Sequence, residues 1–231
     1  GERYVVYSYD GLLMSLTTSG FNGGGGGGTP TTYNVLDYLP IGQGNSYTLE
    51  NNYNAGDVMT LATSFVDGGP FDGTFNIYDD GTGPGAYIGY MSSLGSALYG
   101  WSYDDGSYVL FDSLVSLFGT PYELNMPQDF TIYGTLYDAG GTVLSYTTDT
   151  ITATVNAAGP YTTALNTFYF DDSITLELLW TSTDENFTAT YRSVLIAMAY
   201  GVGVIALHDP QTDQHYSLTS GTVNGSPIVG N

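Results

Sequence analysis

Hydrophobic and polar residues follow one another in short runs that are typical of β-strands. Val, Ile, Thr, Tyr and Phe dominate these runs, which end at clusters of Gly, Asp, Asn and Pro. In residues 150–155, threonines alternate with Ile151, Ala153 and Val155, the pattern of a strand with one solvated face. We predict strands at residues 58–66, 74–78, 130–137, 142–148, 150–155, 174–180, 187–192, 202–207 and 215–219.

Many short strands at this spacing predict an all-β fold, with an immunoglobulin-like β-sandwich head over residues 31–231. The Asp-Ala-Gly-Gly run at residues 138–141 predicts the turn of a hairpin. Residues 109–118 are the exception, because Leu110, Leu114 and Leu117 stand at helical spacing and predict a short helix. Gly and Pro near residues 119–127 mark a place where the head could divide into two sub-domains.

A β-forming segment at residues 1–22 is tied to the head by a glycine-rich linker at residues 23–30, in which six glycines are unbroken. In one interpretation, Asp10 and Gly11 form the turn of a local hairpin with one fully apolar face. In the other, the segment is one long strand that completes the sheet of a neighbouring copy. Connections within a domain are typically about two to six residues long, so the glycine tract favours the second interpretation. The donor positions are then Tyr4, Val6, Leu12, Met14 and Leu16.

The charge balance excludes several classes of partner. The 231 residues include 23 acidic residues but only two basic ones, Arg3 and Arg192, and the net charge is −21. A basic surface for nucleic acids or for anionic membranes cannot be built from two arginines. No apolar run approaches the roughly 20 residues of a membrane-spanning helix. A surface almost without cations avoids self-repulsion once its carboxylates are protonated, so we expect acidic surroundings.

We expect the protein to act outside the cell, at the cell surface. The chain contains no cysteine, so no disulfide framework identifies its compartment. It begins at Gly1 rather than at a methionine, which fits a processed, secreted protein. Asn186 and Asn224 begin Asn-X-Ser/Thr triplets in turn-prone surroundings and are therefore glycosylation candidates.

No pattern of residues predicts catalysis, a metal or a cofactor, so we expect a protein that is not an enzyme. His208 and His215 could bind a metal, but no third convergent ligand is visible, and we interpret them as the two ends of a hairpin loop. Tyrosine faces could stack on sugar rings, although half-buried strand positions are the usual place for the 22 tyrosines of a β-protein. Three Asp-Asp pairs lack the spacing of a calcium-binding loop: 79–80, 104–105 and 171–172. Two of the three stand before glycine in turns, and we interpret the pairs as structural residues rather than as ligands or catalytic groups.

The order of N-terminal strand, linker and β-sandwich head resembles that of donor-strand-complemented filament subunits, namely the chaperone-usher pilins of bacteria and, because this chain has no lysine, the threads of acidophilic archaea. The resemblance covers this organisation and no diagnostic motif. In that family, the donor strand of one subunit fills a groove in the next and builds a head-to-tail polymer. The resemblance implies this role for residues 4–16, although Asp10 and Gly11 introduce a turn-like departure from a straight donor.

We therefore predict a structural subunit of an extracellular filament, which polymerises with copies of itself by donor-strand complementation. It would need no cofactor and no membrane span, and it could carry N-linked glycans. Two alternatives stay open: a secreted, acid-adapted β-sandwich that binds or hydrolyses carbohydrate, and a viral coat subunit.

Acid should stabilise the fold, because clustered carboxylates without neighbouring cations repel one another. This repulsion raises their pKa values in the folded state, so the folded chain binds more protons than the unfolded chain. The resulting stability is present at low pH and is lost as the pH rises through the raised pKa values. We expect a higher melting temperature between about pH 3 and 4 than at about pH 8 in low salt. Calorimetry at the two pH values checks this, and the reverse order would contradict it.

Overall fold

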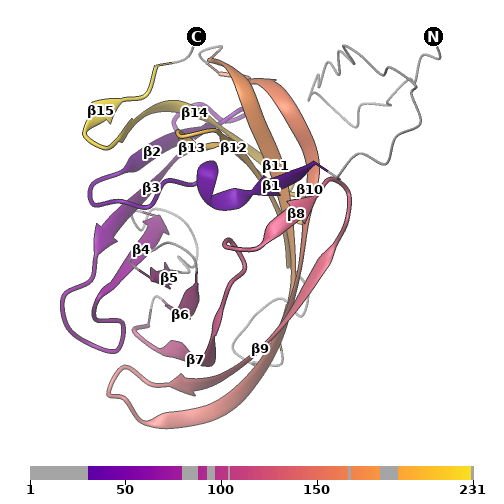
Figure 1. Ribbon diagram of the computed structural model, residues 1–231. Helices are drawn as coiled ribbons and strands as arrows, with labels where there is room; N and C mark the ends of the chain where they lie inside the picture. The colour runs from indigo at the N-terminus through magenta and orange to yellow at the C-terminus, as the bar shows by residue number, and fades with distance from the viewer. Residues whose placement is uncertain are drawn as a thin grey trace, which may run out of the picture. The chain divides into compact units, whose positions relative to one another are not determined.

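The computed structural model describes residues 31–79, 88–92, 97–103, 105–165, 168–182 and 192–229. They belong to a compact unit, Thr31–Asn231, which holds a thirteen-stranded sheet and a separate two-stranded sheet (Figure 1). In chain order, the elements are β1 (Thr32–Asn34), the 3-10 helix η1 (Val35–Asp37), β2 (Ser46–Asn51), β3 (Val58–Phe65), β4 (Thr74–Asp79), β5 (Ile88–Ser92), β6 (Leu98–Ser102), β7 (Tyr108–Val115), β8 (Pro121–Glu123), β9 (Gln128–Tyr137), β10 (Val143–Thr162), β11 (Tyr169–Ser182), β12 (Arg192–Ala199), β13 (Gly203–Asp209), β14 (Gln214–Val223) and β15 (Ser226–Pro227).

The large sheet is an antiparallel meander that closes on itself. Strands that follow one another in the chain are neighbours in the sheet from β2 to β14, with β8 set aside. The hairpin β13–β14 closes the ring, because β14 pairs with β13 and also with β2, the first strand of the meander. Each strand from β2 to β14 in the ring therefore has a neighbour on both sides. This connectivity differs from the Greek-key connections of immunoglobulin-like domains.

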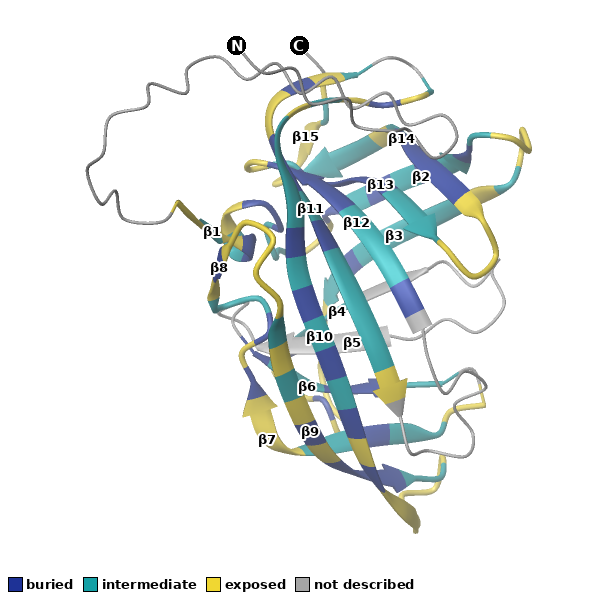
Figure 2. Ribbon diagram, turned by 90° about the vertical axis from the view of Figure 1, so that its right-hand side faces the viewer, coloured by how far each residue is buried: buried dark blue, intermediate teal, exposed yellow. Residues whose placement is uncertain are grey.

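Alternation of side chains along the long strands directs apolar residues into the ring. In β10, Ile151, Ala153 and Val155 are buried, while the threonines between them are half-buried, and Figure 2 shows this banding along β10 and β11. The main core joins these residues to buried side chains of β2, β11, β12, β13 and β14. A smaller cluster of Trp101, Val109 and Leu136 fills the region between β6, β7 and β9.

The two-stranded sheet and η1 cover one end of the ring, as Figures 1 and 2 together show. Tyr38 and Tyr122 bury their rings in the main core. The Tyr38 hydroxyl donates a hydrogen bond of 2.9 Å to the Asp172 carboxylate at the start of β11. The Gly201 amide, between β12 and β13, donates to the Asp37 carbonyl at 2.8 Å. Burial, together with the bond to Asp172, raises the pKa of Tyr38 well above its usual value, so the phenol stays protonated and keeps donating.

The predicted all-β class is confirmed, and most predicted strands overlap an observed one. The short helix predicted at residues 109–118 is wrong, because residues 108–115 form β7 between β6 and β9. Leu114, one of the helically spaced leucines, points to solvent instead of into a core. Cross-strand pairing on two sides outweighs a weak local periodicity.

The proposed donor segment, the glycine linker and residues 187–191 lie outside the described residues. The segment 119–127, where a sub-domain boundary could fall, contains β8, and the strands before and after it pair with each other in the ring.

The predicted turn at residues 138–141 is present and is held by an aspartate. The Asp138 carboxylate accepts hydrogen bonds from the Gly140 amide at 2.9 Å and from the Thr142 amide at 2.7 Å. These backbone donors lower the pKa of Asp138, and Ser107 lowers the pKa of Asp105 in the same way. At these two positions the shift is opposite in sign to the one that carboxylate repulsion predicts, so both carboxylates stabilise the fold above their unfolded pKa values and lose that contribution in acid.

A glycine lets β13 approach β2 at the closure of the ring. Gly203 has φ of +109°, and a Cβ at this position would overlap the hydroxyl of Tyr47 and lie 2.5 Å from its Cζ. Tyr47 is buried in the main core, where burial raises the pKa of its hydroxyl. Any larger residue at position 203 must displace this ring.

Gly203→Ala should destabilise the protein more than Gly201→Ala does. Both glycines have positive φ, which strains an alanine by about 1–3 kcal/mol, and the +109° of Gly203 lies further from the left-handed region than the +65° of Gly201. A Cβ at Gly201 meets nothing within 4 Å. The clash with Tyr47 should add about 1–3 kcal/mol for Gly203→Ala. Thermal unfolding of the two variants measures the difference, which we expect to be roughly 2–10 °C in melting temperature. Equal melting temperatures would show that Tyr47 yields freely.

Candidate functional site

The sequence-predicted site residues are only partly visible in the structure. The donor positions Tyr4, Val6, Leu12, Met14 and Leu16 and the sequon residue Asn186 lie outside the described residues. Asn224 is exposed in the tight turn between β14 and β15, with φ of +51°. Its backbone amide donates a hydrogen bond of 2.9 Å to the side-chain oxygen of Asn45. A glycan at Asn224 stays a prediction.

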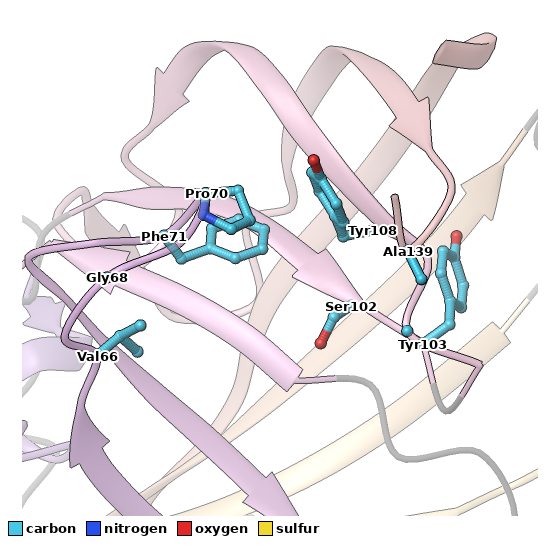
Figure 3. A pocket seen from close by; sticks show the side chains of 9 residues that line it. Val66, Gly68, Pro70, Phe71, Ser102, Tyr103, Tyr108 and Ala139 are labelled. Atoms are coloured by element: carbon cyan, nitrogen blue, oxygen red, sulfur yellow. The ribbon is translucent and has the colours of Figure 1, made fainter. Parts of the chain in front are cut away.

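An aromatic pocket lies where the β3–β4 loop, the β6–β7 turn and the β9–β10 turn meet (Figure 3). The pocket has a volume of about 370 Å³. Figure 3 shows Phe71 beside Pro70 on one side, Tyr103 near Ala139 on the other, and Tyr108 between them. The described residues that line it are Val66, Gly68, Pro70, Phe71, Ser102, Tyr103, Gly106, Tyr108 and Ala139.

The rings of this pocket are fixed by neighbours. Tyr108 stacks on Tyr137 with 5.1 Å between ring centroids, and it meets the edge of Phe71 at 5.9 Å. The hydroxyl of Tyr103 accepts a hydrogen bond of 3.0 Å from the indole N–H of Trp101. Phe71 is buried and forms a wall, whereas Tyr103 and Tyr108 are half-buried and offer accessible surface.

The described lining residues of this pocket offer ring faces and hydroxyl groups. None of them is a carboxylate or a histidine. They combine apolar ring faces with the hydroxyls of Ser102, Tyr103 and Tyr108. Apolar walls with a few directional polar groups are typical of sites for small molecules.

A second cluster lies on the hairpin β13–β14. His208 and His215 are directly opposite each other in the ladder, and their rings stack with 3.7 Å between centroids. The Oδ1 atom of Asp213 lies 3.2 Å from Nε2 of His215 and 3.7 Å from Nε2 of His208. The structure therefore supplies the third convergent group that the sequence did not reveal.

The environment of the cluster keeps His208 neutral. Burial, helped by the neighbouring His215, lowers the pKa of His208, and the Asp213 carboxylate offsets this only in part. Tyr53, from the β2–β3 turn, meets the ring of His215 edge-on at 5.6 Å. Tyr53 therefore covers one side of His215, while the exposed Asp213 carboxylate contacts the imidazole pair from the solvent side.

The Asp-Asp pairs have structural roles where they are described. Asp105 accepts hydrogen bonds from the amide and the hydroxyl of Ser107 within its own turn. Asp172 accepts from Tyr38, as described above. Asp105 therefore lies in a turn, whereas Asp171 and Asp172 lie within β11. Asp80 and Asp104 lie outside the described residues.

Within the part of the chain that the structure describes, no helix has the length and apolar character needed to cross a bilayer.

Comparison with known proteins identifies no family. No family model matches the chain, and no curated protein matches it. A crystal structure of a Parabacteroides distasonis protein, described as a candidate lipoprotein, is similar over 83% of this chain and 98% of its own, with 12% identity and a TM-score of 0.36. A likeness this weak carries no information on function.

Proposed function

We propose that the protein is a secreted, non-enzymatic β-protein that binds a neutral carbohydrate in the pocket of Phe71, Tyr103 and Tyr108. The observation that carries this proposal is the set of fixed aromatic rings around a space of about 370 Å³. The C–H face of a pyranose ring packs against an aromatic face, and its hydroxyls bond to nearby tyrosine and serine hydroxyls.

The size of the pocket and the charge of the chain narrow the range of possible ligands. Small-molecule pockets span about 300–1,000 Å³, so this one is suited to one or two sugar rings rather than to a long chain. The net charge of −21 repels uronic and sialic acids, which favours neutral sugars. Because the rings are already held by Trp101, Tyr137 and one another, little side-chain entropy is lost on binding.

Removing a tyrosine ring should weaken sugar binding. We expect Tyr103→Ala and Tyr108→Ala each to raise the Kd for neutral mono- and disaccharides about tenfold, since an aromatic contact is worth roughly 1–1.5 kcal/mol. Saturation-transfer NMR with glucose, galactose, mannose and their β-linked disaccharides selects the ligand, and titration then gives the Kd. Tyr53→Ala, at an exposed tyrosine outside the pocket, is the matched control. Absence of binding to all of these sugars, or equal Kd values in the three variants, would refute the proposal.

A second candidate function is the one that the order of segments favours, a self-polymerising subunit of an extracellular filament. The observation in its favour is a group of exposed apolar side chains on the hairpin β9–β10: Tyr133, Val143, Leu144 and Tyr146. Tyr146 is 80% exposed, and patches of this kind are typical of interfaces. Because the ring is closed, a segment from another copy would cover this face or extend a free edge, rather than fill a gap in the ring.

Deletion of residues 1–22 should abolish polymers if that segment joins copies. Tyr146→Ser should weaken polymers if the patch contributes, because it removes the most exposed aromatic ring of the patch. Negative-stain microscopy and light scattering of both variants and the full chain measure assembly. Tyr53→Ser is the control for loss of an exposed tyrosine. Undiminished filaments after the deletion would exclude strand donation, and a full chain that stays monomeric would exclude the filament altogether.

A further inference from the structure

We propose that His208, Asp213 and His215 form a binding site for a divalent transition-metal ion of the Zn²⁺ type, which bridges β13 and β14. This inference is independent of the sugar site, which lies on other loops. A bound ion would link the two strands of the hairpin β13–β14.

The ladder and the turn bring the three donors together. His208 and His215 are paired across the hairpin, so their side chains leave the same face of the sheet. Asp213 lies in the connecting turn with φ of +55°, a left-handed conformation that aspartate tolerates better than most residues. The turn directs the carboxylate back over the histidines, where its Oδ1 atom lies within 4 Å of both Nε2 atoms.

The spacing of the donors suits one ion. Ligand atoms of the three residues lie within 4.8 Å of one another. In a tetrahedral site with metal–ligand bonds of about 2.0–2.1 Å, neighbouring ligand atoms are about 3.4 Å apart. The separations of 3.2 and 3.7 Å from Asp213 to the two imidazoles bracket this value. The imidazole rings are parallel within 13°, so binding must rotate them out of their stack until both lone pairs point at the ion.

One imidazole nitrogen makes no hydrogen bond among the described residues. Nε2 of His208 is buried from solvent and makes no hydrogen bond there, since Asp213 at 3.7 Å is too distant for one. A buried polar atom without a partner is costly, and a metal bond would remove that cost.

The donor types select the ion. Two imidazoles and one carboxylate suit Zn²⁺, Cu²⁺ or Ni²⁺, whereas Ca²⁺ and Mg²⁺ prefer oxygen donors. Asp213 is 87% exposed, so a water molecule can complete a fourth position from solvent. The net charge of −21 raises the local concentration of cations around the hairpin.

Metal titration of the full chain tests the site. After chelator treatment and dialysis, the protein should bind one Zn²⁺ per chain in calorimetry, and its melting temperature should rise with Zn²⁺ but not with Mg²⁺. Co²⁺ should give the visible absorption of a four-coordinate site, a signature that a merely structural effect would not produce. Failure to bind either ion at neutral pH would overturn the proposal.

Variants assign the ligands. His208→Gln, His215→Gln and Asp213→Asn should each raise the Zn²⁺ Kd at least tenfold and weaken the Co²⁺ absorption, while Asp209→Asn on the same hairpin should leave both unchanged. Melting of the metal-free variants identifies any that do not fold. If a histidine variant does not fold, the site is tested by the loss of Co²⁺ absorption in the folded Asp213→Asn protein. Equal Zn²⁺ affinity in all four variants, or an equal loss in Asp209→Asn, would place the ion elsewhere and refute the site.

Discussion

The structure depends on one pairing, that of β14 with β2. Every other neighbour relation in the ring from β2 to β14 follows the order of the chain, so the meander alone would produce an open sheet with two free edges. The closing hairpin removes those edges by placing β14 beside both β13 and β2. Free edges pair with strands of other molecules, so this closure decides whether the edge strands pair within the chain or with a neighbouring copy. The close approach of Gly203 to Tyr47 lies at the same junction.

In a closed ring, binding sites lie on the loops that connect the strands and on outward side chains. Backbone donors and acceptors within the ring are used by neighbouring strands, so ligands meet loops and outward side chains. The aromatic pocket follows this rule, because Phe71, Tyr103 and Tyr108 come from connections or strand ends that the ring holds in fixed relation. The histidine cluster lies on the hairpin β13–β14, so an ion bound there would reinforce the pairing between the last two strands of the ring.

The charge of the chain affects these sites differently. A net charge of −21 with two basic residues disfavours anionic ligands everywhere on the surface and favours cations. At Asp138 and Asp105, backbone and serine donors stabilise the ionised carboxylate, so local hydrogen bonds oppose the general repulsion between acidic groups. The balance between these local hydrogen bonds and the general repulsion sets how the stability of the fold depends on pH.

The sequence by itself determined the all-β class, the strand at residues 150–155 and the turn at residues 138–141, because alternation and turn chemistry are local properties. It misassigned residues 109–118, since pairing on both sides of β7 outweighs the spacing of three leucines. Only the tertiary structure closed the ring, joined Phe71 to Tyr103 and Tyr108, and turned Asp213 onto His208 and His215. These contacts depend on strand register and on the φ of single turn residues, which no local pattern of hydrophobic and polar residues encodes.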